Sequence, residues 1–126
     1  MQLDYIENIN EYGENVVRLY DFDKAQAIKF KELISDVIVT KKQKLNLSEI
    51  DFIKNRNCNL IMGLFKTNEG ILSNDNYTFY CVLTLNAYIK MLEILEPFCT
   101  KETKGYQYLY DADNPTEFLF SPAGSW

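Results

Sequence analysis

Residues 77–95 read YTFYCVLTLNAYIKMLEIL, and within this stretch the repeat of apolar residues changes from two positions to three or four. In residues 77–83, alternate side chains fall on opposite faces of an extended chain. One face would carry Tyr77, Phe79, Cys81 and Leu83, and the other Thr78, Tyr80 and Val82. Both sets are mostly apolar or aromatic, which predicts a strand in the interior of a sheet.

A helix is predicted to follow this strand directly. Thr84 suits the N-cap position, because a threonine hydroxyl accepts a hydrogen bond from a free backbone N–H of the first turn. The buried stripe of the helix would consist of Tyr88, Met91, Leu92 and Leu95. Pro97 is predicted to mark its end, since proline removes a backbone hydrogen bond.

A second transition from strand to helix lies nearer the start of the chain. Residues 15–20 are predicted to form a strand, and residues 3–6 another before it. Residues 21–23, Asp-Phe-Asp, suit the N-terminus of a helix, where carboxylates accept backbone hydrogen bonds. The apolar positions that predict this helix are Ala27, Phe30, Leu33, Ile34, Val37 and Ile38.

The remaining segments complete an α+β pattern. Residues 44–57 are predicted as a loop with short elements, and four further strands are predicted at residues 59–66, 71–73, 106–110 and 117–120. The order ββαβββαββ predicts one α+β domain over residues 1–126. Two helices would pack on one face of a largely antiparallel sheet of five to seven strands, giving two layers. Residues 121–126 would form a short C-terminal tail.

Composition excludes several classes of function. The chain has no histidine, so mechanisms that need an imidazole, such as Ser-His-Asp triads and mixed Cys/His zinc sites, are excluded. Its formal net charge is −5, the wrong sign for binding phosphate backbones, so nucleic acid is not an expected partner. No apolar run approaches the ~20 residues of a membrane-spanning helix, and no membrane contact is expected.

The cysteine pattern indicates the cellular compartment of the protein. Cys58, Cys81 and Cys99 are odd in number and widely spaced, with no CxxC pair. The first residues also lack the basic start and apolar segment of a secretory signal. These features favour buried thiols in a reducing cytoplasm, in the style of a bacterial protein.

Two pairs of aspartates are candidates for carboxylate chemistry. Asp21 and Asp23 precede the first helix, and Asp111 and Asp113 lie in the turn before the last strand. Two carboxylates can act as acid and base or hold magnesium, but helix capping and turn formation explain the same residues without chemistry. The five glycines are scattered, so no phosphate loop is present. No catalytic residue, metal or cofactor is predicted, and enzymatic activity is not favoured.

Tyrosine forms the most distinctive pattern near the C-terminus. Tyr106, Tyr108 and Tyr110 occupy alternate positions of one predicted strand and would share a face. Such a face offers a large contact area with little side-chain entropy to lose, although tyrosines on one face also serve core packing. Trp126, the only tryptophan, either docks back onto the domain or anchors a partner. These four residues are the predicted binding residues.

Three hypotheses follow for function. The first is a non-catalytic protein-interaction module, such as an acidic inhibitor or immunity-like protein, that holds a protein partner. The alternative is a protein that binds a small apolar ligand in a pocket between sheet and helices. The third, a carboxylate-based hydrolase, is the least favoured.

Overall fold

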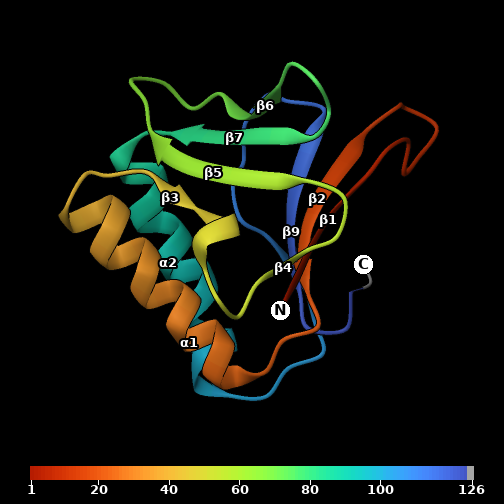
Figure 1. Cartoon of the computed structure of the whole chain (residues 1–126). Helices are drawn as coiled ribbons and strands as arrows, with labels where there is room; N and C mark the ends of the chain where they lie inside the picture. Colours follow the sequence, from red (N-terminus) through yellow and green to blue (C-terminus); the bar gives the residue numbers. More distant parts are fainter. Residues whose placement is uncertain (125–126) are drawn as a thin grey trace.

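The computed structural model describes residues 1–124 (Figure 1). It contains two α-helices, α1 (Lys24–Leu33) and α2 (Leu85–Thr100). A π-helical segment (Ile34–Thr40) extends α1, and a short 3-10 helix covers Leu47–Glu49. The strands are β1 (Gln2–Ile6), β2 (Asn15–Tyr20), β3 (Leu45–Asn46), β4 (Lys54–Asn55), β5 (Asn59–Leu64), β6 (Gly70–Ser73), β7 (Thr78–Leu83), β8 (Gln107–Tyr108) and β9 (Thr116–Ser121).

The α+β class with two helices is confirmed, but the strands divide into two mixed sheets. The five-stranded sheet has the order β4-β1-β2-β9-β8, and the four-stranded sheet has the order β3-β5-β7-β6. In the first, β9 runs parallel to β2, and in the second, β7 runs parallel to β5. The prediction of one largely antiparallel sheet was therefore wrong in its pairing, because each central pair joins strands that are not consecutive in the chain.

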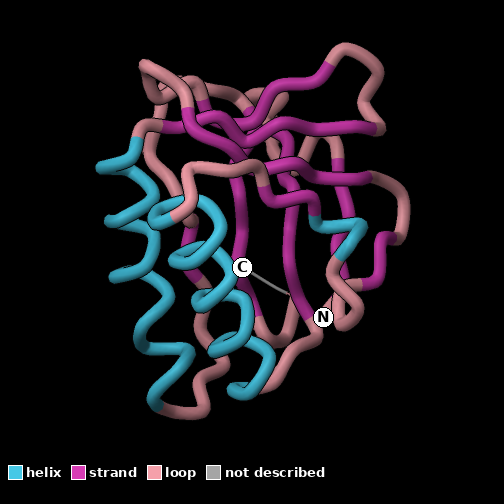
Figure 2. The backbone as a smooth tube through the Cα atoms, turned by 60° about the vertical axis from the view of Figure 1, so that its left-hand side comes forward, coloured by secondary structure: helices cyan, strands magenta, loops and turns pink. Residues whose placement is uncertain are grey.

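Both helices lie together on one side of the molecule, against the strands (Figure 2). Asp23 caps α1, as its position predicted: its carboxylate accepts a hydrogen bond from the Gln26 N–H at 2.8 Å. The Gln26 side chain accepts one in return from the Asp23 N–H, at 3.3 Å, which completes a capping box. No helix in residues 1–124 is long and apolar enough to cross a lipid bilayer.

Helix α2 continues through Pro97, and the prediction that it ends there was wrong. Its last turn is held by Phe98, which is buried and meets the Phe120 ring edge to face, with ring centroids 5.0 Å apart. Phe22 and Phe30 also contact Phe120. This aromatic cluster joins both helices to β9, and the resulting packing offsets the hydrogen bond that proline removes.

Tyr88 belongs to the predicted apolar stripe of α2, yet its hydroxyl has a specific polar role. It accepts a hydrogen bond from the Gly63 N–H at 3.0 Å and donates one to the Cys81 carbonyl. These two groups lie on the neighbouring parallel strands β5 and β7. A helix side chain therefore bridges the backbones of two strands inside the core, where an unpaired polar group is costly.

Two strands in the described part of the chain, β6 and β1, have free backbone groups closed by side chains or by a short strand. On β6, the Ile71 N–H donates to the Tyr110 hydroxyl, and the Ile71 carbonyl accepts from the Asn114 amide at 2.9 Å. On β1, the Asn57 side chain pairs with both backbone groups of Tyr5, and β4 covers the rest. Closed edges prevent unplanned pairing with other chains.

Gly70 begins β6 at a position that no other residue can occupy without strain. Its φ is +82°, and a Cβ there would lie 2.7 Å from the buried ring of Tyr110. We expect Gly70→Ala to lower the free energy of unfolding by about 2–4 kcal/mol, from the left-handed backbone and the steric overlap together. Urea denaturation measures this loss. The control is Gly105→Ala, whose Cβ would find its nearest neighbour at an ordinary 3.5 Å. An equal effect of the two substitutions would contradict the steric argument.

Candidate functional site

The structure separates the three tyrosines that the sequence placed on one face. Tyr106 is 43% exposed, Tyr108 is half-buried, and Tyr110 is only 7% exposed. The strand ends at Tyr108, and Leu109 and Tyr110 are both buried, so the alternation stops there. Tyr106 and Tyr108 meet edge to face with ring centroids 5.8 Å apart. Trp126 lies outside the described residues.

Tyr110 is a structural residue that connects the two sheets. Its hydroxyl accepts a hydrogen bond from the Ile71 N–H of β6, at 3.2 Å, and donates one to the Thr116 carbonyl of β9. Burial raises the pKa of its phenol, so the hydroxyl keeps its proton at neutral pH. Its role is to hold β6 of the four-stranded sheet against β9 of the five-stranded sheet.

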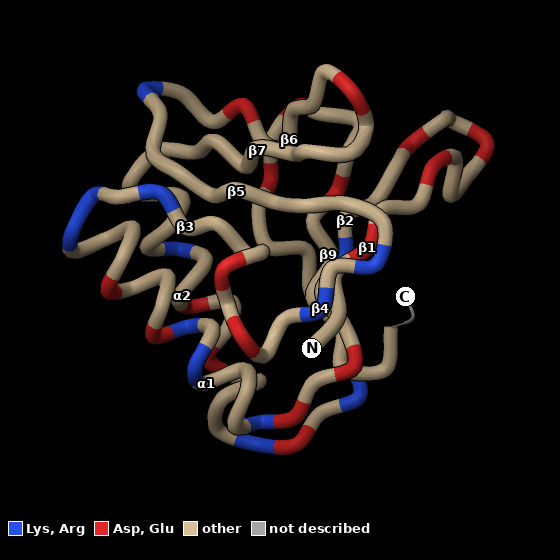
Figure 3. The backbone as a smooth tube through the Cα atoms, viewed as in Figure 1, with Lys and Arg blue, Asp and Glu red and all other residues tan. Residues whose placement is uncertain are grey.

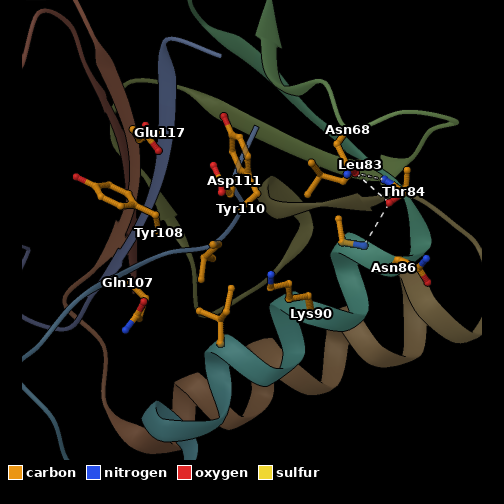
Figure 4. A pocket seen from close by; sticks show the side chains of 13 residues that line it. Asn68, Leu83, Thr84, Asn86, Lys90, Gln107, Tyr108, Tyr110, Asp111 and Glu117 are labelled. Atoms are coloured by element: carbon orange, nitrogen blue, oxygen red, sulfur yellow. Dashed lines mark hydrogen bonds between the residues drawn. The ribbon is translucent and has the colours of Figure 1, made fainter. Parts of the chain in front are cut away.

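Tyr108 and Tyr110 line the same cleft, which lies between the start of α2 and the strands β8 and β9 (Figure 4). The cleft has a volume of about 560 Å³, within the range of sites for small molecules. Its lining is mixed. The polar members are Asn68, Thr84, Asn86, Lys90, Gln107, Tyr108, Tyr110, Asp111 and Glu117, and the apolar members are Leu83, Ala87, Ile94 and Leu109.

The start of α2 forms one wall of this cleft. The Asn68 side-chain oxygen accepts hydrogen bonds from both the N–H and the hydroxyl of Thr84, each at 2.9 Å. The Thr84 hydroxyl oxygen accepts one from the Ala87 N–H at 3.3 Å, as the predicted N-cap. The loop before β6 thereby fixes where the helix begins.

Opposite charges face one another across the cleft. Figure 4 shows Lys90 on the α2 side, and Asp111 and Glu117 on the side of the strands. Burial raises the pKa of the Glu117 carboxyl, and the negative charges of Glu14 and Asp111 raise it further. Among the described residues, neither Lys90 nor these two carboxylates takes part in an ion pair. The cleft thus has a positive and a negative wall that do not neutralise each other.

The predicted aspartate pairs do not come together as pairs in this cleft. Asp23 is the N-cap of α1, and Asp21 accepts a hydrogen bond from the Gln2 amide at 2.6 Å. Asp111 lines the cleft but Asp113 does not. The second carboxylate in the cleft, beside that of Asp111, belongs to Glu117, which was not predicted from the sequence. In β9, Glu117 lies between two residues that the structure shows to be buried, Thr116 and Phe118, so its side chain is on the opposite face of the strand.

The cysteines contribute no reactive thiol. Burial raises the pKa of Cys58 to about 12 and that of Cys81 to about 12. Burial also raises the pKa of Cys99. All three thiols are therefore protonated at neutral pH and weak as nucleophiles. In residues 1–124, no cluster of three or more acidic or cysteine side chains is arranged to hold a metal ion.

A second depression lies between α1 and the segment around Phe52, and its charged lining is mostly acidic. Its carboxylates are Glu32, Asp36, Glu49 and Asp51, and the only cationic side chain in its lining is Lys29. Asp36 is already paired with Lys41 at 3.3 Å. This depression lacks the opposed walls of the cleft beside α2.

Comparison with models of protein families and with curated sequences finds no significant match to this chain.

Glu117 gives the cleft a measurable pH dependence. Its pKa is higher in the folded protein than in the unfolded chain, so the folded state holds this proton more tightly and stability falls as the pH rises through that pKa. The substitution Glu117→Gln removes this pH-dependent loss of stability. We expect the variant to have a higher urea midpoint than the unaltered protein near pH 7, with the difference shrinking near pH 4. Glu11→Gln, in an exposed loop, is the control. If the difference in urea midpoint between Glu117→Gln and the unaltered protein did not change with pH, the raised pKa of Glu117 would be contradicted.

The Tyr110 hydroxyl is expected to contribute to stability. Tyr110→Phe keeps the ring but leaves the Ile71 N–H and the Thr116 carbonyl without this partner. We expect a loss of about 1–3 kcal/mol in the free energy of unfolding. Tyr12→Phe, at a side chain that is 79% exposed, should leave the unfolding curve unchanged. Equal curves for the two variants would show that the buried hydroxyl contributes nothing.

Proposed function

We propose that the protein is a small non-catalytic interaction module, comparable to acidic inhibitor or immunity-like proteins, which binds a protein partner through the outer face of the four-stranded sheet. The observation that carries this proposal is the absence of charge from that sheet. None of the residues in β3, β5, β6 and β7 is charged, although a quarter of the chain is. Figure 3 shows the charges on the helices and loops around these strands.

The inner and outer faces of this sheet differ in burial. Phe79, Cys81 and Leu83 of β7 point inward and are buried. The alternate residues point outward, and Tyr80 is 42% exposed. Its cross-strand neighbours are Leu72 of β6, which is 46% exposed, and Ile61 of β5, which is half-buried.

This row, Ile61–Tyr80–Leu72, has the composition of an interface core. The centres of protein interfaces are depleted of charged residues and enriched in tyrosine, and apolar side chains grouped on a surface mark sites of association. One edge strand of this sheet, β6, already pairs with the Tyr110 and Asn114 side chains, and the other, β3, has only two residues, so a partner would pack on this face and would not add a strand to an edge.

Carboxylates lie at the β6 end of the face and favour a partner with cationic groups there, whereas Lys44 and Lys66 lie beside β3 and β5. Glu69 precedes β6, and Asp75 lies in the turn between β6 and β7. Hydrogen bonds from the Tyr77 and Thr78 N–H groups lower the pKa of Asp75, which keeps it ionised. Complementary rim charge raises association rates more than it raises affinity.

We also place the protein in a reducing compartment, such as a bacterial cytoplasm. The three cysteines are free, and two of them are buried apolar residues in the core. This pattern is typical of proteins that fold without disulfides.

The proposal predicts that Tyr80→Glu weakens partner binding and leaves the fold intact. Removing a central aromatic anchor costs about 2 kcal/mol or more, which corresponds to roughly a 30-fold loss of affinity. The matched control is Tyr12→Glu, which places the same charge on a tyrosine in a distant loop. Quantitative cross-linking and affinity purification would compare the unaltered protein with both variants.

A partner that is retained by Tyr12→Glu and lost by Tyr80→Glu supports the proposed face. A partner recovered equally with both variants contradicts it. Sedimentation equilibrium of the purified protein identifies the case in which the partner is a second copy of this chain.

A further inference from the structure

We propose that the cleft between α2 and strands β8 and β9 binds a small zwitterion with an apolar side chain, of the class of free α-amino acids and dipeptides. This site is separate from the outer sheet face described above. Three features of the cleft carry the proposal: a positive wall, a negative wall, and an apolar lining between them.

The positive wall is built by α2. Lys90 lies in the second turn of the helix and directs its amino group from α2 toward the strands (Figure 4). The first turn adds its own positive character, because the N–H groups at the start of a helix have no intrahelical acceptors. The Thr84 hydroxyl accepts only the Ala87 N–H. A ligand carboxylate fits this wall.

The negative wall is built by the strand side. Asp111 and Glu117 line the cleft there, and Glu14 adds a third negative charge near Glu117. These neighbours and burial raise the pKa of Glu117, so its ionised form is less favourable than that of a carboxylate in water. A ligand ammonium group would reverse both effects, since an opposite charge stabilises a carboxylate.

The two walls leave room for a molecule between them. The three ion pairs in the described part join other residues, Arg18 with Asp4, Lys31 with Glu96, and Lys41 with Asp36. Lys90 therefore does not close the cleft by pairing with Asp111 or Glu117. A ligand with only one sign of charge would satisfy one wall and desolvate the other, whereas a zwitterion matches both.

The apolar lining specifies the rest of the ligand. Ala87 and Ile94 contribute partly exposed apolar surface to the cleft, above the buried side chains of Leu83 and Leu109. An apolar ligand side chain gains about 25 cal/mol for each square ångström of surface that it buries there. The volume of about 560 Å³ accommodates an amino acid the size of leucine or phenylalanine, or a dipeptide.

The test uses the full chain and isothermal titration calorimetry with defined probes. L-leucine, L-phenylalanine and leucyl-leucine are compared with N-acetyl-leucine, which lacks the ammonium group, and leucinamide, which lacks the carboxylate. We expect at least one of the three zwitterions to bind with a dissociation constant below about 10 mM. Each blocked analogue is expected to bind at least tenfold more weakly, because one wall of the cleft is left without a partner.

Two variants test which charged residue of the cleft binds each charged group of the ligand. Lys90→Met should weaken zwitterion binding at least tenfold and remove the preference for leucine over leucinamide. Glu117→Gln should weaken it and remove the preference for leucine over N-acetyl-leucine. Lys104→Met, on an exposed loop outside the cleft, is the control and should bind as the unaltered protein does. Urea unfolding verifies that each variant is folded.

The proposal is overturned if no zwitterion binds at about 10 mM, or if the blocked analogues bind as well as leucine. It is also overturned if Lys90→Met and Lys104→Met behave alike. Tyr80→Glu should leave zwitterion binding unchanged, so this result is independent of the partner-binding face.

Discussion

The whole arrangement depends on β9 pairing in parallel with β2. The two strands align from Asn15 opposite Thr116 to Tyr20 opposite Ser121, about a hundred positions apart in the chain. Both faces of β9 are covered: Phe118, Leu119 and Phe120 are all fully buried. Phe120 is the centre of the aromatic cluster that joins the helices, and Thr116 accepts the hydrogen bond from Tyr110 that links the sheets. The same strand supplies Glu117 to the cleft, so the core and the cleft are fixed by one element.

Local patterns predicted the parts of the fold that local physics controls. Residues 15–20 and the capped helix beginning after Asp23 were predicted correctly, because alternation, apolar spacing and capping act within a few residues. Strand pairing acts between distant segments, so the parallel ladders and the division into two sheets could not be predicted in this way. Pro97 shows the same limit. The helix continues past Pro97 because Phe98 is buried, and the burial of Phe98 cannot be predicted from its neighbours in the sequence.

The candidate sites show a similar division. Tyr110 was predicted as a binding residue because of its spacing, but its hydroxyl is occupied in holding the two sheets together. Lys90 and Glu117 were not predicted, because the cleft brings together a helix and a strand that are far apart in the sequence. The uncharged strands of the four-stranded sheet were visible in the sequence, yet their shared outer face required the register of β5, β6 and β7.

The position of β9 also has a consequence for synthesis. A ribosome adds roughly 5–20 residues per second, so β2 emerges about 5–20 seconds before its central neighbour has been made. During that interval Val17 and Leu19 have only β1 beside them, and the helices lack the ring of Phe120. We therefore expect these apolar segments to stay accessible to solvent until residues 116–121 have been made. Slower synthesis of the last third of the chain lengthens this interval.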